Sequence, residues 1–315
     1  MKKLMLPFLL ICIFSISSYS QTDLGSTLQN VGQEYAQKYL SPLTTGLGTN
    51  LNTGYLGGFD ASGFHKIPVW PHLYAGVKFC GVVMQDVDKT FNMSFQTNIT
   101  YNGTTVPVNW TVNNAPTVFG DKNPAIARGT FSYGGYTHDT TLTLIGGIDN
   151  TKFVPLFLPQ IGVGTVLGTD VIFRMLPPVG YGNYGTYTLY GFALRHSIGA
   201  YVEMPFNIAI QGGYQNFSIK DKNDIKFISA NSLFANLQFS KSIAIITIYG
   251  GVQYENYSVD VNYKFGNVNI GFNQKGDNNF RGIAGATLSL ALAKVNLDIN
   301  YGSKFAFSAG FGFGL

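Results

Sequence analysis

The last eleven residues of the chain alternate strictly between apolar and small side chains. From Phe305 to Leu315 every odd position is apolar, and every even position is Ala, Ser or Gly. Successive strand residues point to opposite faces, so this segment predicts a strand with one apolar face. In water, four Phe on one exposed face would make an aggregation site. The pattern therefore predicts a strand whose apolar face meets lipid and whose small face lines a barrel interior.

The same tail resembles the C-terminal insertion signal of bacterial outer-membrane barrels. That signal has a polar residue, a Gly two positions later and two large apolar residues that end the chain. The matching positions are Ser308, Gly310, Phe313 and Leu315, with Leu in place of the commoner terminal Phe. The resemblance implies that the barrel-assembly machinery inserts the chain into outer-membrane lipid.

The first twenty residues have the pattern of an export signal. Lys2 and Lys3 precede an apolar stretch at 4–16, which is too short to span a bilayer. Small residues before Gln21 predict cleavage between Ser20 and Gln21. We therefore expect a signal peptide at 1–20, a helical segment at 21–45 and an outer-membrane barrel at 46–315. Cys80 would be the only cysteine after cleavage, so we expect it to be a small buried side chain without a disulfide.

The composition separates this chain from soluble domains. Charged residues make up 11% of it, against about 25% in soluble domains. Aromatic residues reach 15%, and no apolar run after the export signal approaches the roughly 20 residues of a transmembrane helix. These features predict an all-β fold, a transmembrane antiparallel β-barrel of about 12 strands with a range of about 10–14. A soluble β-sandwich, the alternative, would carry more surface charge.

The net charge argues against a nucleic-acid partner. Export would remove Lys2 and Lys3 from 20 basic residues and leave 18 against 16 acidic ones. A nucleic-acid surface needs a clustered basic excess, which this balance does not provide.

The segment before the strands has a helical pattern. Apolar residues recur at helical spacing from Leu24 to Tyr39, which predicts an amphipathic helix that Pro42 ends. The sequence favours a helix that packs under the barrel without a gating role, and entry into the lumen is the alternative. Two polar insertions, at 92–138 and 256–279, predict extracellular segments, although the first could instead form a periplasmic hairpin.

Several separate blocks of the chain resemble an uncharacterised outer-membrane β-barrel family of Bacteroidota, classed as a domain of unknown function. The resemblance implies a barrel and an outer-membrane location and no activity. More distantly, the chain is similar to long-chain fatty-acid transporter barrels, which also place a helical segment before the strands. The blocks that carry the family resemblance are Tyr39–Pro42, Gly46–Tyr55, Ala115–Gly120, Leu158–Gly164, Gly168–Thr169, Phe173–Pro177, Leu194–Ile198 and Pro205–Tyr214.

Six charged residues lie within or next to predicted strands. At membrane depth a charge is costly unless it faces the lumen and is paired, so we expect all six to line the barrel interior. They would form either a selectivity constriction or an ion-pair network that fills a narrow lumen. These candidate lumen residues are Arg174, Arg195, Glu203, Glu255, Arg281 and Asp298.

The sequence contains no catalytic or metal-binding pattern. His196 and Ser197 are adjacent on a predicted strand and point to opposite faces, so they cannot cooperate directly. The four His show no metal-ligand spacing with Cys or acidic residues. We expect no cofactor and no enzymatic activity. The expected function is a passive channel or transporter for small solutes, hydrophobic ones included. The alternatives are a non-transporting structural or assembly-partner barrel and, third, an outer-membrane enzyme.

Overall fold

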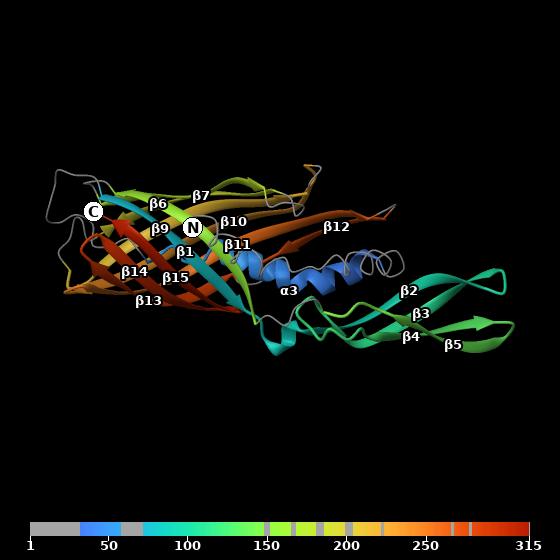
Figure 1. Cartoon of the computed structure of the whole chain (residues 1–315). Coiled ribbons are helices and arrows are strands. Elements are labelled where there is room, and N and C mark those ends of the chain that lie inside the picture. The colour runs from blue at the N-terminus through green and yellow to red at the C-terminus, as the bar shows by residue number, and fades with distance from the viewer. Residues whose placement is uncertain are drawn as a thin grey trace, which may run out of the picture. The chain divides into compact units, whose positions relative to one another are not determined.

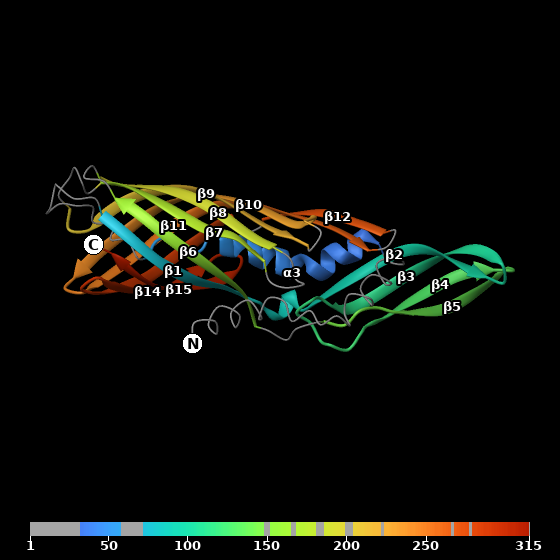
Figure 2. The same ribbon diagram turned by 45° about the horizontal axis from the view of Figure 1, so that its top comes forward.

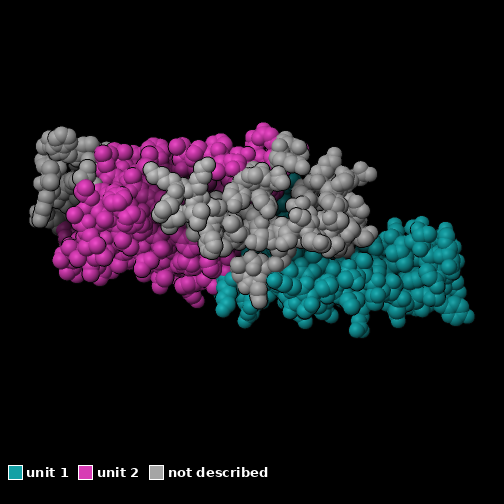
Figure 3. Space-filling model, in the orientation of Figure 1, with its two compact units in different colours: residues 1–44, 84–152, 261–274 teal, residues 45–83, 153–260, 275–315 magenta. Residues whose placement is uncertain are grey.

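The structure is a computed structural model, and it describes residues 32–57, 72–147, 152–164, 168–180, 186–198, 204–221, 224–265, 268–276 and 279–314. The export signal, the start of the expected helix, Glu203 and Leu315 lie outside these residues. The chain forms two compact units, coloured separately in Figure 3. Unit 1 comprises residues 1–44, 84–152 and 261–274, and unit 2 comprises 45–83, 153–260 and 275–315.

Unit 2 is a closed antiparallel barrel (Figure 1). Each barrel strand pairs with the next one along the chain, and the last, β15, pairs back with the first, β1. Ten strands form the ring, and β12 (Val268–Lys275) pairs only with β11 outside it. The barrel strands are β1 (His72–Val83), β6 (Phe153–Gly164), β7 (Thr169–Gly180), β8 (Thr186–Ser197), β9 (Asn207–Lys220), β10 (Lys226–Ile243), β11 (Ile246–Phe265), β13 (Phe280–Leu290), β14 (Ala293–Tyr301) and β15 (Phe305–Gly314).

The predicted all-β barrel is confirmed, with ten strands where we expected 12. Ten lies within the expected range. The difference arises because the chain from 84 to 152 forms part of unit 1 instead of contributing strands to the ring. Strand β12 also stays outside the ring.

The two faces of the wall differ as the alternation predicts. On β14, Leu297 is 62% exposed on the outer face, whereas its neighbour Asp298 is 4% exposed on the inner face. On β15, Phe311 and Phe313 point outward, and Ser308, Gly310 and Gly312 are buried. The wall therefore has an apolar outside and a polar or small inside.

The small face of β15 makes room for side chains from its neighbours. Gly310 pairs with Lys78 of β1 and with Asn296 of β14. A Cβ added at Gly310 would lie 2.6 Å from Asn296 Oδ1 and 2.7 Å from Lys78 Cδ. Glycine is therefore required here by the volume of the two neighbouring side chains.

The helix α3 spans Gln33–Leu51, and the expectation that Pro42 ends it is wrong (Figure 2). Proline lacks a backbone N–H, and its ring crowds the preceding turn, at a cost of about 3 kcal/mol inside a helix. The residues that follow Pro42 are nevertheless helical and largely buried, so their packing outweighs this cost. The helix also runs past residue 45, where we expected the helical segment to end. No helix among the described residues is both long and apolar enough to cross a membrane.

Unit 1 contains a four-stranded antiparallel sheet in the order β2-β3-β4-β5. Its strands are β2 (Thr90–Tyr101), β3 (Thr104–Pro116), β4 (Ile126–Tyr133) and β5 (Tyr136–Thr143), preceded by the 3-10 turn η1 (Asp86–Asp88). The insertion at 92–138 is thus two hairpins, and the insertion at 256–279 is the end of β11 followed by β12. Both are regular structure because buried apolar residues alternate along them, Trp110 and Val112 in the first and Val259 and Val261 in the second.

Two tyrosines fix the first turns of α3 within unit 1. The Tyr39 hydroxyl donates to the carbonyl of Gly146 at 3.0 Å, and the Tyr39 carbonyl accepts from the N–H of Val118 at 3.0 Å. The Tyr35 ring packs edge-on against Phe91, with 5.5 Å between the ring centroids. Burial raises the pKa of the Tyr35 phenol to about 12, so this hydroxyl stays neutral.

The tight fit at Gly310 gives a first prediction. We expect Gly310→Val to lower the free energy of unfolding in detergent micelles by about 1–3 kcal/mol, because the new side chain would overlap Lys78 and Asn296. The matched control is Ala309→Val, which adds similar bulk to the outer face of the same strand. Urea unfolding of both variants measures the difference, and equal stability would contradict a filled interior at this position.

Candidate functional site

Residues 45–57, which we call the lumen segment, form the most buried stretch of unit 2. They comprise the last two turns of α3 and the coil that follows it. Thr49, Asn50, Leu51 and Thr53 are each 0% exposed. The side chains that surround them come from the inward face of the barrel strands, so this segment occupies the barrel interior.

The last carbonyls of α3 have no donor four residues later within the helix, although the Thr49 and Asn50 carbonyls accept from the N–H groups of Asn52 and Thr53 in the turn that follows. The last carbonyls of a helix have no intrahelical donor and carry the partial negative charge of the helix dipole. A basic residue in the last turn would stabilise them, but α3 has none there. The cations come instead from the barrel wall, through Arg281 and Arg174.

Both guanidinium groups donate to carbonyl oxygens of the lumen segment. Arg281 Nη2 donates to the Thr49 carbonyl at 3.0 Å, and its Nη1 donates to Thr53 Oγ1 at 2.7 Å. Arg174 Nη1 donates to the Thr53 carbonyl at 2.9 Å and to the Leu51 carbonyl at 3.4 Å. Charge-assisted bonds of this kind are about twice as strong as neutral ones, so these two residues anchor the helix end.

Other wall residues hold the coil after the helix. Gln253 Nε2 donates to the Asn52 carbonyl at 3.0 Å, and Lys78 Nζ donates to the Gly57 carbonyl at 2.6 Å and to Asn296 Oδ1. The thiol of Cys80 is buried, with its Sγ 3.7 Å from the Thr53 carbonyl oxygen. The lumen segment is therefore attached to the wall by hydrogen bonds along its length.

Two buried ion pairs join neighbouring strands on the inner face of the barrel wall. Arg281 Nε donates to Glu255 Oε2 at 2.7 Å, and Arg195 Nε donates to Asp170 Oδ2 at 2.7 Å. The first pair also contacts the lumen segment through Arg281, whereas the described bonds of Arg195 go to Asp170.

Five of the six candidate lumen residues are described, and all five are buried. Asp298 accepts from Ser308 Oγ at 2.6 Å, from Asn300 Nδ2 at 2.7 Å and from the Tyr249 hydroxyl at 3.2 Å. Arg174 and Arg281 are brought together on the lumen segment, while Arg195 and Asp298 bond to other wall residues. The geometry thus has features of an ion-pair network, whereas Arg174 donates to neutral oxygen acceptors and forms no ion pair with a described carboxylate.

Sequence reasoning did not identify Lys78, Gln253 or the lumen segment as part of the site. A weak signal is present in the run 44–54, which consists of small, polar and Gly residues with Leu47 and Leu51 and contains no charge. Such a run suits a segment enclosed in a polar lumen. No cluster of three or more His, Cys, Asp and Glu side chains in the described parts of the chain could hold a metal ion.

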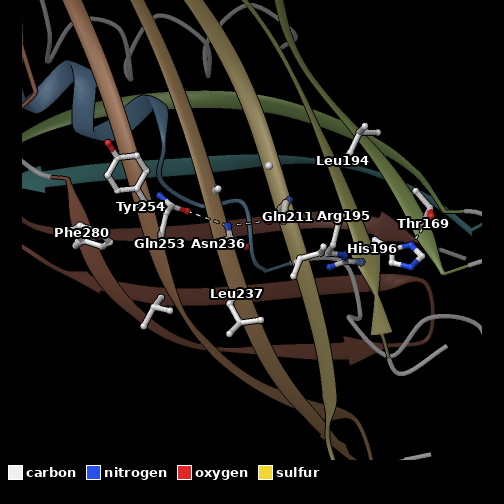
Figure 4. Close-up of a pocket in the computed structure, with 14 residues that line it drawn as sticks. Thr169, Leu194, Arg195, His196, Gln211, Asn236, Leu237, Gln253, Tyr254 and Phe280 are labelled. Carbon is white, nitrogen blue, oxygen red and sulfur yellow. Dashed lines mark hydrogen bonds between the residues drawn. The ribbon is translucent and has the colours of Figure 1, made fainter. Parts of the chain in front are cut away.

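A hollow of about 670 Å³ opens across β8–β11 and the first residues of β7 and β13 (Figure 4). Its apolar lining is largely on the outer face, where Leu194, Ile210 and Val252 are exposed. The inward part of its polar lining includes the amide chain from Gln211 through Asn236 to Gln253, joined at 3.3 and 3.1 Å. Thr169 Oγ1 and His196 Nδ1, which lie 2.8 Å apart, add a polar pair at the edge of an otherwise apolar outer surface.

A family model described as "Family of unknown function (DUF6588)" matches residues 1–315. No curated protein matches the chain.

Solved structures of outer-membrane barrels show a remote similarity. The β domain of the Bordetella autotransporter BrkA is 9% identical, with a TM-score of 0.32, 78% of this chain covered and 98% of that one. OmpT, an outer-membrane protein of Vibrio cholerae, is 10% identical, with a TM-score of 0.26 and coverages of 80% and 99%. The translocator domain of NalP from Neisseria meningitidis is 10% identical, with a TM-score of 0.26 and coverages of 90% and 97%. Scores of this size carry no functional argument, so the fold rests on the strand pairing itself.

The two ion pairs provide a matched test of what holds the lumen segment. We expect Arg281→Met to speed amide hydrogen exchange in residues 49–53, because it removes both bonds of Arg281 to this segment. It should also destabilise the barrel by about 3–5 kcal/mol, since the buried Glu255 loses its cation.

The control is Arg195→Met, which breaks the other buried pair. It should cost similar stability and leave exchange in residues 49–53 unchanged. Equal exchange in both variants would contradict the anchoring role of Arg281.

Proposed function

Because the chain belongs to DUF6588, a family of unknown function, we propose its role from the geometry of the lumen. We propose a non-enzymatic bacterial outer-membrane barrel that transports a small solute and whose lumen segment is a displaceable gate. The observation that carries the proposal is the polar attachment of residues 45–57 to the wall. In this conformation the gate is closed.

The outer face of the barrel supports a membrane location. Large apolar side chains are exposed on many of the barrel strands, including Phe173, Leu233, Ile248 and Leu297. Soluble monomers rarely expose such a continuous apolar surface, whereas a membrane barrel presents it to lipid. The export signal and the tail at Ser308–Leu315 agree with the same location.

The hydrogen bonding of the lumen segment is more consistent with a displaceable gate than with a permanent part of the core. Its atoms Thr49 Oγ1, Asn50 Oδ1, Asn52 Oδ1 and Asn52 Nδ2 are buried without a hydrogen-bond partner among the described residues. Each such group costs about 1–3 kcal/mol. An open, hydrated lumen would offer these groups water as a partner, which favours a displaceable segment over an apolar core.

The second candidate is a non-transporting barrel that serves a structural or assembly role. The buried pairs Arg195–Asp170 and Arg281–Glu255 favour it, because they fill the interior as a fixed network would. The two candidates differ in one respect: a gate must leave the lumen, and a structural core must not.

A disulfide lock separates them. A Cβ added at Gly54 would lie 3.1 Å from Cys80 Sγ, so Gly54→Cys should crosslink the lumen segment to β1 on oxidation. We expect bilayer conductance from the reduced variant, loss of that conductance on oxidation and recovery with a reductant.

The control is Gly54→Ser, which has the same strained backbone, with φ at +77°, and no thiol. Its conductance should not respond to oxidant. Conductance that persists in the crosslinked protein would contradict the gate, and a silent reduced protein would favour the structural candidate.

The unpartnered amide of Asn52 gives a further prediction. We expect Asn52→Leu to stabilise the closed state by about 1–3 kcal/mol, because a similar shape replaces a buried amide without partners. The open probability of single channels should fall by roughly fivefold or more. Asn109→Leu, which alters an exposed amide of unit 1, is the control and should leave it unchanged. A rise in open probability would show that the Asn52 amide favours the closed state.

A further inference from the structure

Arg174 differs from the other buried cations of the barrel. Among the described residues, Arg195 and Arg281 pair with carboxylates, and Lys78 donates two hydrogen bonds. Arg174 is 1% exposed and forms no ion pair with a described carboxylate, and its Nη2 makes no hydrogen bond of good geometry to a described residue. The described buried groups of unit 2 include four cations, Lys78, Arg174, Arg195 and Arg281, against three carboxylates, Asp170, Glu255 and Asp298. Lys78 and Arg174 are thus the two described buried cations that form no ion pair with a described carboxylate, and of the two only Arg174 contacts the lumen segment with a guanidinium that can bind a carboxylate at two atoms.

What now faces Arg174 is a set of dipoles. Two carbonyls of the lumen segment accept from Nη1, Gln160 Oε1 accepts from Nε at 3.0 Å, and the Tyr55 ring lies 3.5 Å from the guanidinium carbon. A guanidinium in a buried site is best satisfied by a carboxylate that accepts from both Nη atoms. Among the described residues, one of these two donors, Nη2, has no acceptor in good hydrogen-bond geometry.

The wall beside Arg174 is apolar. The Tyr55 ring packs on Phe234 with 4.4 Å between the ring centroids, and it forms a buried cluster with Tyr74, Ile172 and Ala193. Of this cluster only Tyr55 belongs to the lumen segment, and the other four residues project from β1, β7, β8 and β10. The wall thus provides a cation next to a pocket that accepts an aromatic ring.

We propose that this pocket is a binding site for a small aromatic carboxylate, and that the lumen segment occupies it in the closed state. The Tyr55 ring takes the place of the ligand's apolar body, and the Leu51 and Thr53 carbonyl oxygens take the place of its carboxylate. Ligand and lumen segment compete for Arg174, so binding opens the gate. This inference rests on the proposed function and names the class of solute.

The test is equilibrium binding of benzoate to the full-length protein in detergent micelles, with benzamide as the neutral analogue and inorganic phosphate as a second anion. We expect benzoate to bind at least about tenfold more tightly than either, because only benzoate offers both a carboxylate and a ring. Equal binding of benzamide would overturn the role of Arg174, and equal binding of phosphate would overturn the role of the apolar wall.

Two variants complete the test. Tyr55→Ala should tighten benzoate binding about tenfold, because it removes the competing ring and keeps every wall residue. Arg174→Gln should weaken it about tenfold or more, and Arg128→Gln, an exposed arginine of unit 1, should leave it unchanged. If Arg174→Gln does not fold, Tyr55→Ala decides alone, and unchanged or weaker binding in that variant would overturn the proposal.

The result is distinguishable from that of the gate experiment. Conductance that the Gly54→Cys crosslink abolishes, without selective benzoate binding, would leave the gate and reject the ligand class. Selective benzoate binding, with conductance that the crosslink does not change, would leave the ligand site and reject the gate.

Discussion

The capping of the α3 C-terminus by cations of the barrel wall is the interaction on which the interior depends. The helix end brings carbonyls with free acceptor capacity and a partial negative charge into an enclosed space. Arg174 and Arg281 bring positive charge into the same space. Either group alone would be buried at a cost of several kcal/mol. When both are present, the arginines donate to the carbonyls, so the helix end stabilises the buried cations of the inner wall and the cations stabilise the helix end.

The same constraint explains the small residues of the closing strands. Lys78 reaches the Gly57 carbonyl from a position on β1 that pairs with Gly310 of β15. A larger residue at 310 would overlap the Lys78 side chain on its way into the lumen. The outer face of β15 accommodates large Phe side chains because no neighbouring side chain restricts their volume there. One strand thus meets an apolar requirement outside and a volume requirement inside, which is the alternation seen at the end of the sequence.

The faces of the barrel strands were predictable, and the partners across the lumen were not. A period of two decides which side chains point inward, so Asp298 could be placed from β14 alone. Strand number was harder, because Val108, Trp110 and Val112 alternate in unit 1 much as barrel residues do. The lumen segment left little local signal, since most of its hydrogen bonds to the wall go to main-chain carbonyls, which every residue has. The bond from Arg174 to Thr53 joins residues 121 positions apart.

The wall cations differ in how strongly they oppose release of the lumen segment. Arg195 keeps Asp170 whether or not the segment is present, and Arg281 keeps Glu255. Arg174 would lose both carbonyl partners and retain only Gln160. Arg281, Gln253 and Lys78 would also lose bonds to the segment, but Arg174 is the guanidinium that would be left without a carboxylate among the described residues. A ligand shifts an equilibrium only by its difference in affinity for the two states. An anion that binds Arg174 only when the segment has left has that difference, so a residue that resists opening is also the one through which a solute could drive it.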